Sequence, residues 1–151
     1  MSSGFEKMRR RRILVRRVLA CVLVTVVAFT LLFSARVDAN YGSAAGGERK
    51  AIMRIGKSYI GTPYSQMNCS QFTSTVYGKA TGVYMPADYV AQRSYGRTPA
   101  RLKKGDLLTY KDHVGIYAGN GQILHSSTYF GSVVVSETKY LHGYLGARRI
   151  R

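Results

Sequence analysis

The sequence predicts an α+β domain in which N-terminal helices pack on an antiparallel β-sheet. Two patterns support this prediction: apolar residues recur at helical spacing between residues 48 and 82, and they alternate with a period of two beyond residue 99. The chain has 151 residues, 46% of them apolar, and three prolines. This composition fits one globular domain with some accessory sequence, and it excludes multidomain, collagen-like and mostly disordered chains.

The first 39 residues have the order of a targeting segment. A basic region over residues 7–17 precedes an uninterrupted apolar run over residues 18–33, and Val37 and Ala39 occupy the −3 and −1 positions of a possible cleavage site. We therefore expect a secretory signal peptide over residues 1–39.

An uncleaved membrane anchor is the alternative interpretation. Residues 18–35 are long enough for it, since a spanning helix needs about 17 to 25 residues. In both cases we expect the rest of the chain to act outside the cytoplasm, either secreted or associated with the cell envelope. A short linker over residues 40–47 would lead to a single domain over residues 48–151.

Positive charge persists beyond the targeting segment. The whole chain has a formal charge of +16, and residues 40–151 retain 15 Lys and Arg against five Asp and Glu. Such a balance favours anionic partners. No helix-turn-helix or RNP-like pattern accompanies the charge, so nucleic acid is not expected as a partner. The alternative to an anionic partner is that the basic surface only keeps the protein soluble.

The helical half contains two amphipathic segments. The first is expected over residues 48–59, where a Gly-Thr-Pro sequence soon follows. The second is expected to start at or beside Cys69, with Asn68 as its N-cap, and to stop near Gly82. Its apolar face comprises Cys69, Phe72, Val76 and Ala80.

The second half predicts an antiparallel meander with turn residues between its strands. On the strand after Lys111-Asp112, alternation places His113 opposite the aliphatic core face, among smaller and more polar residues. The candidate strands are Asp106–Lys111, His113–Ala118, Gln122–Ser127, Ser132–Glu137 and Tyr144–Ile150.

His125 lies on the same face of the sheet as His113 only in one of two possible strand registers. A three-residue loop over residues 119–121 would place His125 on the same face as His113, at about 7 to 8 Å. A two-residue loop over residues 120–121 would turn His125 to the other face, unless a bulge compensates. The sequence permits both.

Cys69 is the one cysteine of residues 40–151, so this part of the chain forms no internal disulfide. A lone cysteine is more often a small buried residue than a nucleophile. At the start of a helix, however, the positive end of the helix dipole is expected to lower the pKa of the thiol.

Several motifs occur in one order: Gly61-Thr-Pro-Tyr64, Asn68-Cys-Ser70, Gly105-Asp-Leu107, His113-Val-Gly-Ile-Tyr117, Ile123-Leu-His125 and Gly146-Ala-Arg-Arg149. With this order and spacing, the chain resembles the NlpC-type family of bacterial cell-wall cysteine peptidases. The resemblance spans about residues 48–151. It implies a papain-like fold.

The resemblance also implies roles for individual residues. Cys69 would be the nucleophile, His113 its base, and His125 the residue that orients the base. The Tyr64 hydroxyl and the backbone N–H of Cys69 would donate to the reacting oxygen. The expected oxyanion and substrate-binding residues are Tyr64, Asn68 and Ser70.

The chain departs from the family pattern at several positions. Asn68 replaces the usual aspartate and so removes a negative charge that can hold a free amino terminus. Gln71 replaces a usual glycine. Met85-Pro86 and Gln92 match only part of another family stretch, and we expect no catalytic role for them.

By this resemblance, we expect an exported peptidoglycan endopeptidase that cuts stem peptides, at the γ-D-glutamyl to diamino acid bond, by a Cys-His thiol mechanism. A non-catalytic cationic wall-binding module and a related cysteine amidase or acyltransferase are the alternatives. The expected partners are stem peptides and the anionic cell wall, with membrane contact only through residues 1–35 if they remain uncleaved. We expect a monomer.

No cofactor or metal is expected. Cys69, Asp112, His113 and His125 could be taken as a zinc set, but they lack the tight ligand spacings of zinc sites.

Overall fold

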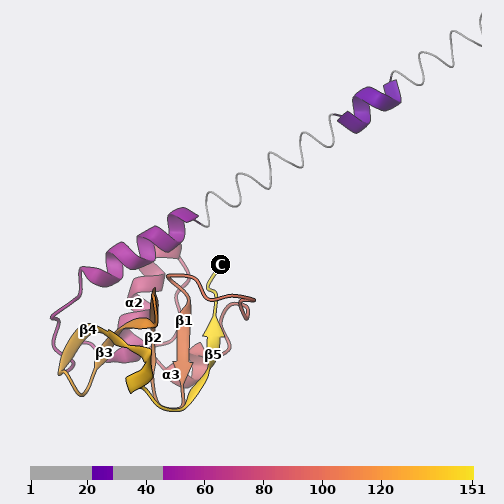
Figure 1. Ribbon diagram of the computed structural model, residues 1–151. Coiled ribbons are helices and arrows are strands. Elements are labelled where there is room, and N and C mark those ends of the chain that lie inside the picture. Colours follow the sequence, from indigo (N-terminus) through magenta and orange to yellow (C-terminus); the bar gives the residue numbers. More distant parts are fainter. Residues whose placement is uncertain (1–21, 29–45) are drawn as a thin grey trace, which may run out of the picture. The chain divides into compact units, whose positions relative to one another are not determined.

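The computed structural model describes residues 22–28 and 46–151 (Figure 1). The chain divides into two compact units, over residues 1–43 and 44–151. In the first unit, residues 22–28 are helical. Across both described ranges, no helix has the length and apolar character needed to cross a bilayer. Apart from residues 22–28, the predicted signal peptide or anchor lies outside the described residues.

The first helix of the second unit covers residues 46–57. It includes Gly46 and Gly47, which were predicted to belong to the linker. It ends at Lys57, two residues before the predicted end at Tyr59. The chain then turns through Gly61, whose φ of 89° lies in the left-handed region that glycine adopts without strain.

The second helix matches its prediction closely. α2 spans Cys69–Thr81 and ends at Gly82, whose φ of 72° gives a left-handed cap. Of the predicted apolar face, Cys69, Phe72 and Val76 are buried, and Ala80 packs against the same core. A one-turn helix, α3 (Tyr89–Gln92), was not predicted.

Five strands form one antiparallel sheet in the order β4-β3-β2-β1-β5. The first four make the predicted meander, and β5 pairs with the free edge of β1. β3 and β4 have the predicted bounds, β1 and β5 are shorter than predicted, and β2 has the predicted length but is shifted by one residue toward the C-terminus. The strands are β1 (Leu107–Tyr110), β2 (Val114–Gly119), β3 (Gln122–Ser127), β4 (Ser132–Glu137) and β5 (Tyr144–Arg148), with the 3-10 turn η1 (Thr138–Tyr140) after β4.

The connection between β2 and β3 combines both expected registers. A two-residue turn over Asn120 and Gly121, both with positive φ, pairs Gly119 with Gln122. An extra residue, Ala118, then shifts the register, so that Tyr117 pairs with Ile123. This bulge places His125 on the same face as His113.

The two faces of the sheet have different cores. α2 packs on the aliphatic face, where its Phe72 and Val76 join a cluster with Val114, Ile116, Leu124 and Val133 (Figure 1). The opposite face carries a smaller cluster of Leu108, Tyr110, Ile123 and Ala147. The helices therefore pack on the antiparallel sheet as predicted, and both histidines lie on the face away from α2.

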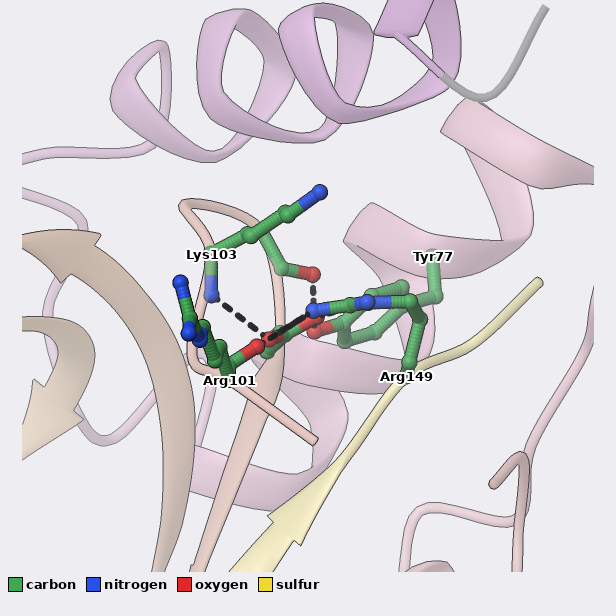
Figure 2. A network of polar contacts seen from close by, with 6 residues as sticks. Tyr77, Arg101, Lys103 and Arg149 are labelled. Carbon is green, nitrogen blue, oxygen red and sulfur yellow. Dashed lines mark hydrogen bonds and ion pairs between the residues drawn. The ribbon is translucent and has the colours of Figure 1, made fainter. Parts of the chain in front are cut away.

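A buried ion pair ties the chain end to the start of the sheet (Figure 2). Asp106 is fully buried, and its carboxylate accepts two hydrogen bonds of 2.8 Å from the Arg149 guanidinium. The backbone N–H of Lys103 donates to the same carboxylate at 2.8 Å, and Arg149 also donates to the carbonyl of Arg101 at 2.9 Å. Asp106 lies just before β1, where its backbone N–H donates to the carbonyl of Lys103 at 3.0 Å and closes the turn.

We expect Asp106→Asn to lower the free energy of unfolding by about 3 kcal/mol, because it leaves the Arg149 charge partly buried without its partner. Urea denaturation of the full chain measures this change. Glu48→Gln is the matched control, since the Glu48–Arg151 pair is partly exposed and 3.6 Å long. It should cost about 0.5 kcal/mol or less. Equal small losses in both variants would contradict the structural role of Asp106.

Candidate active site

Cys69 is the first residue of α2, and a capping box fixes this helix start. The Asn68 side chain accepts a hydrogen bond from the backbone N–H of Gln71, and the Gln71 side chain accepts one from the backbone N–H of Asn68, both at 2.9 Å. Gln71 thus has a structural role at a position where the resembling family has glycine.

Gln92 of α3 holds the first turn of α2 from the other side. Its fully buried side chain donates to the carbonyls of Ser70 at 2.9 Å and Pro86 at 2.7 Å, and it accepts from the Thr73 hydroxyl at 2.6 Å. All of its hydrogen-bonding groups are used inside the protein. Gln92 therefore positions the helix that carries Cys69.

The Cys69 thiol is buried and free. Burial raises its pKa, while hydrogen bonds from the backbone N–H groups of Val114, Ser70 and Cys69 itself act in the opposite direction. The net direction is upward, so the predicted lowering of this pKa is wrong for the free protein. The contact with Val114 places the sulfur beside the residue that follows His113.

The two predicted histidines are directly linked. Nε2 of His113 lies 2.7 Å from Nδ1 of His125, with the rings nearly perpendicular and their centroids 4.9 Å apart. Nε2 of His125 lies 2.9 Å from the hydroxyl of Ser136 on β4. The three side chains form one hydrogen-bonded series. Nδ1 of His113 takes no part in this series.

Gly115 makes room for this series. It lies on β2 between the two histidines, and a Cβ added there would meet Ile123 side-chain atoms at 2.5 and 2.7 Å and the His125 Cβ at 2.9 Å. Such distances are shorter than any van der Waals contact. The glycine of the His-Val-Gly motif thus lets the His125 side chain cross over β2 toward His113.

Burial keeps both histidines neutral. It lowers the pKa of His113 to about 4, and burial together with repulsion from a protonated His113 lowers the pKa of His125 to about 4. A neutral imidazole can accept a proton, so His113 can act as a base near pH 7.

We assign the tautomers from this role. If Nδ1 of His113 is the basic atom, then its Nε2–H donates to His125, and the Nε2–H of His125 donates to Ser136.

Tyr64 is placed by backbone pairing along the outer edge of β4. Gly61 donates to the carbonyl of Val133 at 2.9 Å, and Tyr64 donates to the carbonyl of Gly131 at 2.8 Å. Partial burial raises the pKa of the Tyr64 hydroxyl, and a negative charge on Cys69 would raise it further. The Gly-Thr-Pro-Tyr motif therefore brings a phenol close to the thiol.

The other two predicted binding residues have internal partners. The Ser70 hydroxyl is buried and lies 3.0 Å from the side-chain oxygen Oδ1 of Asn68 and 2.9 Å from the backbone carbonyl of Ala87. Asn68 accepts hydrogen bonds within the helix cap. Neither residue lines the cleft described next, so the structure gives both a part in holding the loop around Cys69.

A cleft of about 710 Å³ opens beside the histidines. Tyr64, His113 and His125 all line it, and an aromatic and apolar wall is formed by Tyr129, Phe130, Tyr140 and Leu141. The remaining lining residues are Asp112, Ser127, Thr128 and Ser136. Within the described part of the chain, no three His, Cys, Asp or Glu side chains are grouped as metal ligands.

The sequence did not indicate Ser136. Alternation places it on the same face as His125, but its use as a partner depends on the β3–β4 register, in which His125 pairs with Val134 and Ser136 is the diagonal neighbour. A serine in a strand sequence does not by itself indicate that its hydroxyl will contact a histidine. The imidazole series and the Tyr64 phenol line this cleft, whereas the buried Cys69 thiol does not line it and contacts Val114, the residue after His113. A thiol, a neutral imidazole series and a phenol in one region are together suited to acyl transfer.

Comparison with known proteins agrees with this chemistry. A model of the NlpC/P60 family matches residues 56–149. A probable endopeptidase, an NlpC homolog of Haemophilus influenzae, is 34% identical over 128 residues, which are 76% of this chain and 69% of that protein. The structure of the peptidoglycan hydrolase RipB from Mycobacterium tuberculosis matches with a TM-score of 0.64 and 28% identity, over 72% of this chain and 67% of that one.

Two further relatives are named for different bonds. A γ-D-glutamyl-L-lysine dipeptidyl-peptidase of Bacillus cereus is 31% identical over 65% of this chain and 35% of that protein. A murein DD-endopeptidase and LD-carboxypeptidase of Escherichia coli, MepS, is 31% identical over 60% of this chain and 53% of that protein. The chain thus spans about a third to a half of the length of these two proteins.

The family match covers more than half of the chain, and the helices on a five-stranded antiparallel sheet are the fold of the matched structures. The chain therefore belongs to the NlpC/P60 family and is a cysteine peptidase with the papain-like fold that its motifs predicted.

Proposed function

We propose that this protein hydrolyses amide bonds in peptidoglycan stem peptides, with Cys69 as nucleophile and His113 as base. The hydrogen-bonded series from His113 through His125 to Ser136, whose three residues line one cleft, is the observation that carries the proposal. The buried Cys69 thiol contacts Val114, the residue that follows His113. The names of the related endopeptidases and of the matched hydrolase support the choice of peptidoglycan as substrate.

The first half of the reaction forms an acyl-enzyme. Nδ1 of His113 takes the thiol proton of Cys69 as the sulfur attacks the amide carbonyl. The backbone N–H of Cys69 and the Tyr64 hydroxyl donate to the oxyanion of the tetrahedral intermediate. When the C–N bond breaks, the His113 imidazolium gives its proton to the leaving amine, and a thioester remains on Cys69.

The second half releases the acyl group. His113 accepts a proton from water, and the resulting hydroxide attacks the thioester carbonyl. The C–S bond then breaks, the carboxylic acid leaves, and the sulfur recovers a proton from His113. His125 positions His113 throughout, because its own ring is held by Ser136.

We assign the γ-D-glutamyl to diamino acid bond as the target. The B. cereus relative is named for a bond of this type, whereas the E. coli relative is named for others. Export through residues 1–39 belongs to the same proposal, because peptidoglycan lies outside the cytoplasm.

Digestion of purified peptidoglycan by the full chain should release peptide fragments that begin with the diamino acid and leave stem peptides that end in D-glutamate on the glycan, both identified by mass spectrometry. Cys69→Ala should abolish their release, since no other cysteine lies in the described part of the chain. Tyr64→Phe should lower kcat by about a hundredfold to a thousandfold, because it removes one oxyanion donor.

Three other results would contradict the proposal. Fragments that persist in Cys69→Ala would exclude this nucleophile. Products joined to an added amine in place of free acids would favour an acyltransferase. Wall binding with no cleavage by the wild type would favour the non-catalytic module.

The low pKa of the two histidines predicts that stability falls with acid. Between pH 6.5 and 4 the unfolded chain binds protons that the folded site does not, so the stabilisation is complete above pH 6.5 and is lost as pH falls through about 4. At about 1.4 kcal/mol per pKa unit, the pair should account for at least about 3 kcal/mol.

Urea denaturation at several pH values tests this prediction. The double variant His113→Gln/His125→Gln should show a clearly flatter decline of unfolding free energy with acid than the wild type. Parallel curves for the two proteins would mean that the histidines are not held neutral by the fold.

The net charge of +10 on residues 40–151 should draw the protein to the anionic cell wall, as part of the proposed function. Salt screens such attraction, since the Debye length is about 8 Å at 0.15 M and about 3 Å at 1 M. Added NaCl should therefore reduce the cleavage rate on whole walls more than on a short soluble stem peptide. Equal salt sensitivity on both substrates would exclude a role for the basic surface.

A further inference from the structure

We propose that Asp112 binds an ammonium group of the substrate beside His113, and so selects a residue with a free amine on the leaving-group side of the bond. The inference rests on the proposed function, because it names a feature of the substrate that the same cleft receives. It assigns a specificity-determining role to a residue that the reaction itself does not use.

The charge of the cleft is opposite to that of its surroundings. Residues 46–151 carry 15 Lys and Arg, yet none of them lines the cleft. Both histidines in the cleft are neutral at pH 7, so Asp112 is its one charged lining residue. A negative group in this position attracts a cation and repels a carboxylate.

Asp112 is also the one free carboxylate of the described residues. Residues 46–151 contain five acidic side chains, and four of them have partners. Glu48 pairs with Arg151, Asp106 with Arg149 and Glu137 with Lys139, and Asp88 caps α3. Asp112 is exposed and makes no hydrogen bond or ion pair within residues 46–151, so its charge is available to a ligand.

The backbone around Asp112 is fixed from both sides. In the β1–β2 turn, Tyr110 donates to the carbonyl of His113 at 2.8 Å, and Lys111 donates to the carbonyl of Gly143 at 2.8 Å. The Arg93 guanidinium donates to the carbonyls of Tyr110, at 3.0 Å, and Lys111. A carboxylate on such a turn loses little backbone freedom when it binds a ligand, which favours binding.

The position next to His113 determines which part of the substrate Asp112 meets. His113 gives its proton to the leaving amine, so the amino acid that carries this amine must lie beside it. A diamino acid has a second amine, which is an ammonium at pH 7 when it is not linked to another group.

Two soluble peptides test the inference: L-Ala-γ-D-Glu-L-Lys, and the same peptide with its ε-amine acetylated. For the wild type we expect kcat/KM to be about fivefold higher for the free amine, which corresponds to a well-formed exposed ion pair. Asp112→Asn should abolish this preference. Glu137→Gln removes the same charge outside the cleft and should keep it. A wild type without preference, or a preference that survives in Asp112→Asn, would overturn the inference.

A binding experiment separates this inference from the proposed function. If the wild type cleaves neither peptide, the proposed function is wrong for these substrates. Calorimetry with the full-length Cys69→Ala variant then decides the inference alone. Tighter binding of the free-amine peptide by about fivefold, lost when Asp112→Asn is added, would support it. Equal affinity for the two peptides, or binding of neither, would overturn it.

Discussion

The pairing of β2 with β3 is the constraint on which the site depends. Side chains alternate along a strand, so a slip of one residue would turn His125 toward α2 and separate it from His113. The bulge at Ala118 prevents this slip while the tight turn over Asn120 and Gly121 closes the hairpin. Gly115 then leaves the space in which the two rings meet.

The family motifs and the residues around them divide into three groups by what they do. Cys69, His113 and Tyr64 are the residues that the proposed reaction uses. The Gly105-Asp106 and Arg149 motifs lie away from the cleft, where their buried ion pair joins the last residues to the turn before β1. The capping box and Gln92 form a third set, since they fix the helix start from which the thiol projects. Much of the motif resemblance thus reflects the scaffold that positions a few reacting groups.

Local patterns predicted local structure well. The helix start at Cys69 and the bounds of β3 and β4 follow from the N-cap residue, the turn residues and alternation, which act over a few residues. The addition of β5 to the free edge of β1 was not predicted, because it depends on pairing between segments about 37 residues apart. Ser136 was missed for a related reason, since its role exists only in one register of two strands. The direction of the Cys69 pKa could not be predicted either, because burial of the sulfur is a tertiary property that outweighs the helix start.

Burial of Cys69 has a consequence for the lifetime of the protein in an oxidising environment. Oxidants attack the thiolate far faster than the thiol, and an unpaired cysteine has no disulfide partner to protect it. With its pKa raised and its sulfur covered, Cys69 rests in the less reactive thiol form, and in the proposed reaction it is ionised only when His113 takes its proton. The resting protein should thus resist oxidation of the Cys69 thiol to sulfenic and sulfinic acid. In the proposed reaction, the thiol must in return be deprotonated in every turnover.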